Sequence, residues 1–411
     1  MFVFWKAFGK RAKLRGRFGE RTKMSFSGFY KDKKVLVTGH TGFKGSWLTE
    51  WLLMMGAKVT GLALPPPTDP ALFDQLGLAA RCDHRIGDIR DRALVRRIIR
   101  EVRPDLIFHL AAQPLVRFSY LQPVETYEIN VMGSAHVLDA LRDADWPCAT
   151  VMITTDKVYE NKERIHTYQE NDPLGGYDPY SSSKACAELM IQSYRQSYFN
   201  PKEVERKVAK NAKESGIVAV ASARAGNVMG GGDWAQDRVV PDCIRALAKG
   251  EVIAVRNPNA TRPWQHVLEP LSGYLLLGMK MYESLDGSSK GVGGADSLHS
   301  ALLTSYASFF NFGPLQSSNR SVRDLVSEIL KQWPGKWRDS SDPGAFHEAG
   351  LLNLAIDKAF HVLGWQPRWD FEQTVLVTVS WYRAACEKGG GGVSLLTRAQ
   401  IAEYSEQVGS I

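Results

Sequence analysis

The sequence has no long hydrophobic run and no paired cysteine motif. None of its apolar stretches reaches the roughly 18 residues that a membrane-spanning helix needs, so we expect no membrane span. The five cysteines are scattered, odd in number and without a CxxC pair. This argues against a disulfide framework or a zinc site and fits a reducing compartment. We therefore expect a cytoplasmic protein without a bound metal.

Most of the chain also lacks net charge. The formal charge of +7 comes from residues 1–23, which hold eight Lys/Arg and one Glu, so that the remaining residues are balanced in charge. Because the body is neutral, we expect no nucleic-acid partner. We interpret residues 1–29 as a basic leader outside the fold, an upstream extension before a start at Met24. A surface-binding arm or a transit-like segment is the alternative.

Strands and helices alternate over the first half of the chain. Short β-rich runs predict strands at 33–39, 57–64, 105–112, 148–156 and 216–225, and helical spacing predicts helices at 43–56, 93–102, 123–144 and 178–199. This alternation predicts a parallel sheet that is covered on both faces. We therefore expect an α/β protein with an extended Rossmann-type, doubly wound sheet.

The regular alternation of strands and helices ends after Asn227, where prolines, tryptophans and glycines become frequent. We expect a dinucleotide-binding domain at 30–226, a smaller mixed substrate-binding lobe at 227–390 that partly returns to the first domain, and a tail at 391–411. Residues 200–216 are highly charged and residues 284–300 are rich in Ser and Gly. Both are interpreted as insertions at the surface.

The stretch "VTGHTGFKGS" places Gly39, Gly42 and Gly45 between a predicted strand and a predicted helix. Glycines permit a tight turn and a close approach of the backbone to a pyrophosphate, and the helix N-terminus offers unpaired N–H groups. A plain strand–helix turn would look similar. At the first βα junction of a doubly wound pattern, the spacing indicates dinucleotide binding. The acid that often ends the second strand is missing, so that this strand does not distinguish NAD from NADP.

Two further stretches carry polar groups suited to chemistry. In "YSSSK", Tyr180 and Lys184 are four residues apart and share one helix face, so that the lysine should lower the pKa of the phenol. In "VMITTDKVYEN", a strand ends on Thr155, Asp156 and Lys157. At this strand end Lys157 is either an ion-pair partner of Asp156 or a group that moves protons.

Taken in order, TGxxGxxG, "DIRD", "HLAAQ", "NVMGS", "TTD" and YxxxK resemble the extended short-chain dehydrogenase/reductase family. Longer stretches, including "GHTGFKGSWL", "RAGNVMGGGDWAQDR", "RNPNATRPWQHVLEPL" and "LGWQPRWD", resemble the nucleotide-sugar 4,6-dehydratases, and among them those that act on CDP-glucose. The resemblance covers roughly residues 30–385. It implies NAD as the cofactor, CDP-glucose as the substrate and a homo-oligomer.

The resemblance also implies roles for individual residues. Those expected to hold the cofactor are Gly39, Thr41, Gly42, Phe43, Gly45, Asp88, Ile89, Ala111 and Ala112, together with Tyr180 and Lys184. Those expected to act in catalysis are Thr155, Asp156, Lys157, Tyr180 and Lys184. Those expected to bind the substrate are Asn227, Arg238 and Arg262. Arg262 could instead form a surface ion pair, and Trp234 and Trp264 could simply fill the core.

The reaction that the resemblance implies has three steps: oxidation at C4 of the sugar, elimination of water across C5 and C6, and reduction at C6. Lys157 stands where related dehydratases carry a carboxylate. A nucleotide-sugar epimerase, or a dehydratase for another nucleotide, is an alternative within the same fold. A non-catalytic NAD-binding regulator is an alternative of a different class, against which the intact Thr155, Tyr180 and Lys184 argue.

Overall fold

The computed structural model describes residues 26–200, 218–286, 303–342, 344, 350–387 and 392–408. Residues 1–25 of the predicted leader lie outside these residues. So do the two predicted insertions, apart from Asn200 and residues 284–286. Phe26 and Tyr30 are buried against the core. The five cysteines are all described and are free thiols. Within the described part of the chain, no helix is both long and apolar enough to cross a membrane.

The centre of the molecule is a parallel sheet of seven strands, in the order β11–β6–β5–β4–β1–β2–β3. The strand order reverses between β1 and β4, which confirms the doubly wound prediction. The strands are β1 (Lys34–Thr38), β2 (Lys58–Ala63), β3 (Asp83–Ile86), β4 (Leu106–His109), β5 (Cys148–Ile153), β6 (Val218–Arg224) and β11 (Phe309–Asn311).

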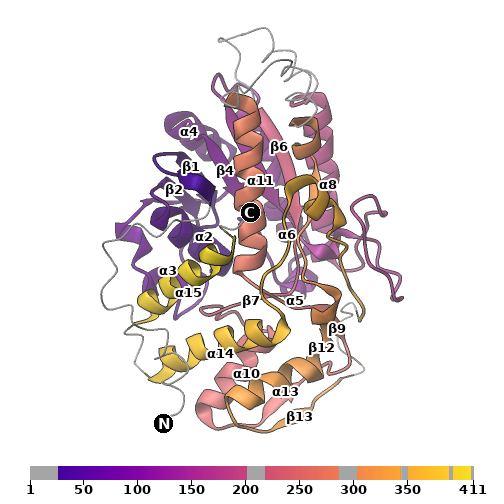
Figure 1. The fold of residues 1–411 in the computed structure, drawn as a ribbon. Coiled ribbons are helices and arrows are strands. Elements are labelled where there is room, and N and C mark those ends of the chain that lie inside the picture. Colours follow the sequence, from indigo (N-terminus) through magenta and orange to yellow (C-terminus); the bar gives the residue numbers. More distant parts are fainter. Residues whose placement is uncertain are drawn as a thin grey trace.

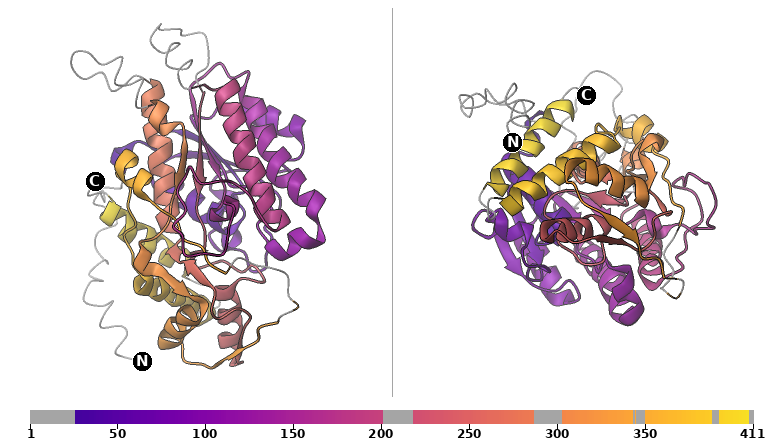
Figure 2. Two further views of the ribbon diagram at one scale, coloured as in Figure 1. Left: turned by 90° about the vertical axis from the view of Figure 1, so that its right-hand side faces the viewer. Right: turned by 90° about the horizontal axis from the view of Figure 1, so that it is seen from below.

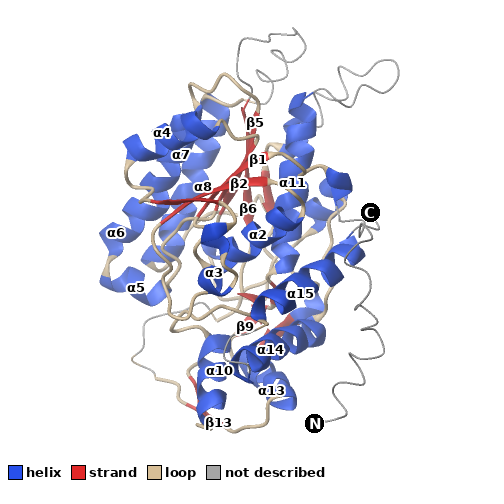
Figure 3. Cartoon of the chain, turned by 90° about the vertical axis from the view of Figure 1, so that its left-hand side faces the viewer, coloured by secondary structure: helices blue, strands red, loops and turns tan. Residues whose placement is uncertain are grey.

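Helices cover both faces of this sheet (Figures 2 and 3). Because side chains alternate along a strand, Val35 and Val37 of β1 join one core cluster and Leu36 joins another. The first cluster includes α2 (Phe43–Met54), α11 (Leu268–Asp286) and α15 (Val393–Val408). The second includes α4 (Arg92–Val102), α7 (Ser134–Leu141) and α8 (Pro179–Ser197).

The helix predicted at 123–144 is interrupted by a wider turn. It runs as α6 (Pro123–Tyr127), a π-helical turn (Glu128–Gly133) and α7. The buried Asn130 lies in this turn and donates hydrogen bonds to the Gln113 carbonyl oxygen and to Ser183 Oγ. The π turn thus directs an amide toward α8, as such turns often do near functional sites.

The other elements form a smaller lobe below the sheet, with α10 (Val239–Lys249), α13 (Val322–Gln332) and α14 (Phe371–Glu387) (Figure 1). Its strands pair as β7 (Val228–Met229) with β10 (Gln265–His266), β8 (Ile253–Val255) with β13 (Trp337–Asp339), and β9 (Thr261–Pro263) with β12 (Asn319–Ser321). Parallel and antiparallel pairs both occur, so that the lobe is mixed, as expected. The domain boundaries stay a prediction.

The remaining elements are short. They are α3 (Leu72–Gln75), α5 (Val116–Leu121), 3-10 turns at Phe26–Gly28, Leu78–Ala80, Asp156–Val158 and Gln316–Ser318, and a π turn at Ala359–Leu363.

Candidate active site

A cavity of about 1000 Å³ lies at the carboxyl ends of the sheet strands, between the sheet and the smaller lobe. This is where open α/β sheets bind their ligands. The cavity lining includes the end of every strand from β1 to β6 or the residues that directly follow it. Every site residue predicted from the sequence lines this one cavity: Gly39, Thr41, Gly42, Phe43, Gly45, Asp88, Ile89, Ala111, Ala112, Thr155, Asp156, Lys157, Tyr180, Lys184, Asn227, Arg238 and Arg262.

The glycine turn is closely packed on one side and open on the other. Gly39 has φ +75°, and a Cβ there would lie 2.7 Å from the Ala111 nitrogen. A Cβ at Gly45 would lie 2.1 Å from the Gly39 oxygen, whereas one at Gly42 would meet nothing closer than 3.4 Å. Gly42 directly precedes α2 and provides no side-chain cap. The first N–H groups of α2 therefore remain available to an anion, which fits the pyrophosphate of a dinucleotide.

The far end of the cavity is formed by residues after β3 and β4. Asp88 forms an ion pair with Arg90, at 2.6 Å between Oδ2 and Nη2, and accepts a hydrogen bond from the Arg90 N–H. Ile89 is buried, and its side chain would collide with any Cβ at Gly133. The structure therefore fixes these two residues at the edge of the cavity, beyond the glycine turn.

Tyr180 and Lys184 are held at the start of α8. Pro179 begins this helix, and the Asp178 side chain caps it by accepting from the Ser181 N–H. Tyr180 donates its backbone N–H to Ser119 Oγ at 3.0 Å, and Lys184 donates from Nζ to the Ile153 oxygen at 3.4 Å. The two side chains are buried and come from one face of one helical turn.

The predicted lowering of the Tyr180 pKa was wrong for this structure. Burial raises the pKa of Tyr180 to about 12, and this outweighs the hydrogen bond with Thr155 and the charge of Arg238, which both lower it. Burial also lowers the pKa of Lys184 to about 8, against the charge of Glu188. The sequence shows the spacing of the pair but not its desolvation, which depends on residues far along the chain.

Thr155, Asp156 and Lys157 follow β5 directly. Thr155 caps a 3-10 turn at Asp156–Val158 and donates from its hydroxyl to Asp156 Oδ1 at 3.0 Å. The other oxygen, Oδ2, accepts from Asn227 Nδ2 at 3.0 Å. A Cβ at Gly226 would lie 1.8 Å from Asp156 Oδ2. The carboxylate is therefore held by its partners, while Lys157 is half-buried and lines the cavity beside it.

The smaller lobe supplies the rest of the cavity. Arg238 pairs with Asp233 at 3.1 Å. Arg262 is buried, not at the surface, and donates from Nη1 to the carbonyl oxygens of Thr261 and Gly350. Trp234 packs edge-on against Tyr382, and the buried Trp264 donates from Nε1 to the Arg320 oxygen. Both tryptophans fill the core and line the cavity, so the two interpretations do not exclude each other.

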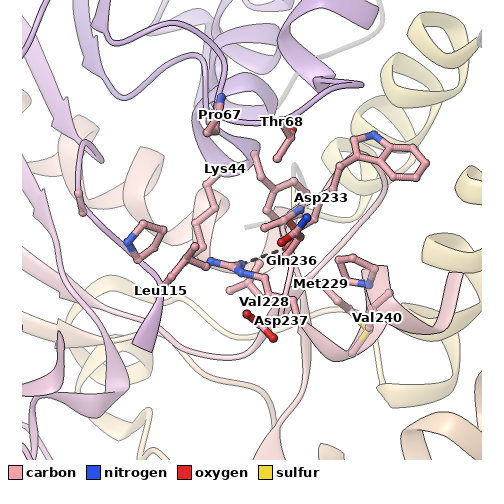
Figure 4. A pocket seen from close by; sticks show the side chains of 18 of the residues that line it. Lys44, Pro67, Thr68, Leu115, Val228, Met229, Asp233, Gln236, Asp237 and Val240 are labelled. Carbon is pink, nitrogen blue, oxygen red and sulfur yellow. Dashed lines mark hydrogen bonds and ion pairs between the residues drawn. The ribbon is translucent and has the colours of Figure 1, made fainter. Parts of the chain in front are cut away.

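Sequence reasoning missed several charged residues that line the cavity. Asp237 pairs with Arg117 at 3.4 Å and with Arg256 at 2.5 Å, and so joins α5 to the loop after β8. Asp233 pairs with Arg238, and Lys44 extends from α2 into the cavity opposite Asp233 (Figure 4). For Lys44, Asp233, Asp237 and Arg256, the only signal in the sequence was that they fall inside stretches quoted for the family resemblance.

Comparisons with known proteins agree with this arrangement. The family model described as GDP-mannose 4,6 dehydratase matches residues 36–378. A CDP-glucose 4,6-dehydratase of Salmonella typhimurium (strain LT2) is 43% identical over 378 residues, which are 92% of this chain and 97% of that protein. A dTDP-glucose 4,6-dehydratase of Streptomyces antibioticus is 27% identical and covers 85% of this chain and 92% of its own.

Solved structures show the same fold. A dTDP-glucose 4,6-dehydratase of Streptomyces venezuelae, solved with NAD and TYD bound, has a TM-score of 0.66 and 23% identity and covers 85% of this chain and 96% of its own. A dTDP-glucose 4,6-dehydratase of Bacillus anthracis in complex with NAD has a TM-score of 0.65 and 20% identity. The match covers 86% of this chain and 97% of that one. Since the family model spans most of the chain and the 43% identical relative is covered almost completely, the chain belongs to the family of nucleotide-sugar 4,6-dehydratases.

Proposed function

We propose that the protein converts CDP-glucose to CDP-4-keto-6-deoxyglucose with loss of water, using NAD as its cofactor. The observation that carries this proposal is that one cavity joins the glycine turn, the Tyr180–Lys184 pair and the Thr155–Asp156–Lys157 stretch. The 43% identity with a CDP-glucose 4,6-dehydratase over nearly the whole of both chains supports the choice of nucleotide.

The residues around the glycine turn fit the cofactor. The open side of Gly42 and the uncapped start of α2 would hold its pyrophosphate, and Asp88 and Ile89 would lie at its adenosine end. When bound, NAD would supply the acceptor for the hydride from C4 and the donor of hydride for C6. Ala111 and Ala112 leave room for a dinucleotide beside the end of β4.

Tyr180 is proposed to take the proton of the C4 hydroxyl as the C4–H bond breaks. Thr155 hydrogen-bonds the tyrosine in this structure and would also hold the sugar hydroxyl. Because burial disfavours the phenolate, positive charge must stabilise it. Arg238 already lowers the pKa of Tyr180, and Lys184 on the same helix face is proposed as the second cation. With the sugar hydroxyl held between Thr155 and Tyr180, the tyrosine would remove the hydroxyl proton as a general base.

The elimination of water is proposed to use Lys157 and Asp156. A ketone at C4 acidifies the C5 proton, so that a neutral Lys157 can remove it, while a protonated Asp156 gives its proton to the departing C6 hydroxyl. The C5–H and C6–O bonds break, a C5–C6 double bond forms, and water leaves. Lys157 as a partner for Asp156 or for a phosphate is the competing role, and it is tested below.

The experiment that tests the function is a parallel incubation of the purified protein with CDP-glucose, dTDP-glucose and GDP-mannose. Mass spectrometry should show loss of one water from CDP-glucose, and faster than from the other two. A sugar of unchanged mass but altered stereochemistry would identify an epimerase. Faster loss of water from dTDP-glucose or GDP-mannose would identify a dehydratase for that nucleotide, and no conversion of any substrate would favour the non-catalytic NAD-binding protein.

We also propose a cytoplasmic homo-oligomer. Leu121, Val124 and Leu189 are 68%, 70% and 56% exposed and belong to α5, α6 and α8 or their ends, which pack together. An apolar surface of this kind supports self-association. The five free thiols support a reducing compartment. Light scattering of the purified protein tests the first part, since a monomer would contradict it.

A further inference from the structure

The loop that follows Lys157 contains a turn with an unusual backbone conformation. Glu163 has φ +49°, in the left-handed region that residues with a Cβ rarely adopt. The side chain of Asn161 supports this conformation by accepting a hydrogen bond from the Glu163 N–H at 2.9 Å. A residue persists in such a conformation only where its surroundings stabilise it, so that the contacts of Glu163 identify what the turn holds in place.

Those contacts are with a segment 187 residues further along the chain. The Glu163 carboxylate accepts the Gly350 N–H, at 3.0 Å to Oε1 and 2.8 Å to Oε2, and the Leu351 N–H at 3.1 Å to Oε2. Asn161 donates from Nδ2 to the Leu351 oxygen at 2.8 Å. A Cβ at Gly350 would lie 2.8 Å from Glu163 Oε2, so that a side chain there would displace the carboxylate.

The carbonyl group of Gly350 contacts a residue of the cavity. Its oxygen accepts from the Thr261 N–H at 3.0 Å and from Arg262 Nη1 at 3.1 Å. Arg262 is buried and lines the cavity, whereas Glu163 does not line it. One peptide segment therefore lies between the two side chains, with the Gly350 N–H bound by the carboxylate and the Gly350 oxygen bound by the guanidinium.

The same segment has further attachments that do not involve Glu163. The Tyr168 N–H donates to the Asn353 oxygen and the Ala355 N–H donates to the Tyr168 oxygen, both at 2.9 Å. Asn353 also donates from Nδ2 to Thr167 Oγ1 at 3.2 Å. Because these bonds hold the segment after Leu351, a change at Glu163 should act locally, on Gly350 and on the arginine bound to it.

We propose that Glu163 is a positioning residue, which acts through Gly350 to hold the Arg262 guanidinium toward the diphosphate of the substrate. This inference rests on the proposed function, in which Arg262 binds the nucleotide sugar. A guanidinium matches phosphate oxygens only in a defined orientation, and an arginine side chain has many rotamers. Fixed carbonyl acceptors reduce this freedom before the ligand arrives, and such preorganisation increases affinity.

The test measures the dissociation constants of CDP and of NAD⁺ for wild type and for Glu163→Gly. Glycine adopts a positive φ without strain, so that this variant keeps the turn and removes only the carboxylate. The constant for CDP should rise by about 5- to 20-fold, and that for NAD⁺ should stay within about twofold of wild type. KM for CDP-glucose should rise with kcat near normal. Glu163→Gln, whose amide oxygen still accepts from the backbone, should restore much of the affinity.

A double-mutant cycle tests whether the effect passes through Arg262. Arg262→Met should weaken CDP binding by itself. Adding Glu163→Gly to Arg262→Met should then change the constant by less than about twofold, because the group that Glu163 positions is already gone. Additive losses would show that Glu163 acts on the ligand independently of Arg262 and would contradict the proposal.

A purely structural role predicts a different result, in which Glu163→Gly melts at a lower temperature and weakens CDP and NAD⁺ equally. We expect a melting temperature close to that of wild type without ligand, a smaller upward shift with CDP and an unchanged shift with NAD⁺. Glu160→Ala is the matched control, since Glu160 lies on the same loop but pairs with Lys162 at the surface, at 3.5 Å. It should bind both ligands as wild type does.

The two proposals fail in different ways. If the wild-type protein bound no CDP and left CDP-glucose unchanged, the proposed function would be wrong. If wild type bound CDP and converted CDP-glucose, and Glu163→Gly had the same constant for CDP within about twofold, only the role of Glu163 would be overturned.

Discussion

Glu188 and Arg224 form an ion pair, 2.9 Å from Oε2 to Nη2, that is buried between α8 and β6. Glu188 lies one helical turn after Lys184, and it also accepts hydrogen bonds from the hydroxyls of Thr154 and Ser222. It thereby links the end of β5 to the helix that carries Tyr180. Burial lowers the pKa of Lys184 to about 8, and the negative charge of Glu188 limits this effect.

Glu188→Gln should move the alkaline limb of kcat/KM to lower pH. Lys184 is a cation below its pKa, and removal of a negative neighbour favours its neutral form, so that its pKa should fall further below about 8. A pH profile of kcat/KM for CDP-glucose measures the shift. Ser222→Ala, which removes one hydrogen bond but no charge, should leave the limb in place. An unchanged limb in Glu188→Gln would show that Lys184 does not set it.

The Glu188–Arg224 ion pair should also stabilise the folded protein. Glu188→Ala leaves the Arg224 guanidinium buried without its carboxylate, and loss of one partner of a buried pair costs about 3–5 kcal/mol. Denaturant unfolding measures this change. A loss below about 1 kcal/mol would indicate that water or another group replaces Glu188, since exposed ion pairs contribute amounts of that size.

Tyr180→Phe should lower kcat by about 10²–10⁴-fold, the usual range for loss of a general base. The fold should be retained, because the contact that anchors this residue is its backbone N–H to Ser119. Tyr127→Phe is the matched control, since Tyr127 donates to Ser182 on the same helix but does not line the cavity. Near-normal turnover of Tyr180→Phe would remove the tyrosine from the mechanism.

Lys157→Ala should separate the two halves of the reaction. If Lys157 removes the C5 proton, the variant should still reduce bound NAD⁺ when CDP-glucose is added, but should neither eliminate water nor exchange the C5 hydrogen with solvent deuterium. Absorbance of NADH and mass spectrometry follow the two halves. Lys157→Met distinguishes the binding role, which would raise KM and leave kcat and C5 exchange near normal.

The sequence predicted the alternation of strands and helices because each buried strand is a short apolar run that ends at a glycine or a polar group. It predicted neither β3, since Asp83–Ile86 is an edge strand without fully buried residues, nor β11, since Phe309–Asn311 is only three residues long and joins the sheet from far along the chain. The positions of Tyr180 and Lys184 on one face followed from their spacing. Their pKa values did not, because these depend on the burial of both side chains in the folded chain.

The charged residues of the cavity also show what sequence patterns cannot predict. Asp237, Arg117 and Arg256 meet from three segments that no local pattern connects. Lys44 was visible in the glycine motif, but only the folded structure shows that its neighbours Asp156 and Asp233 are already engaged by other groups. The residues predicted from sequence patterns line one cavity, but their pKa values and ion pairs depend on tertiary structure.

The most direct test of the proposed function uses CDP-glucose that carries deuterium at C4. Transfer of hydride from C4 to C6 within one cycle predicts a product that has lost one water and carries the deuterium at C6, with no net accumulation of NADH. Mass spectrometry and NMR of the product read out both features. A product that keeps its mass, or steady growth of NADH absorbance with each turnover, would contradict the proposed 4,6-dehydratase activity.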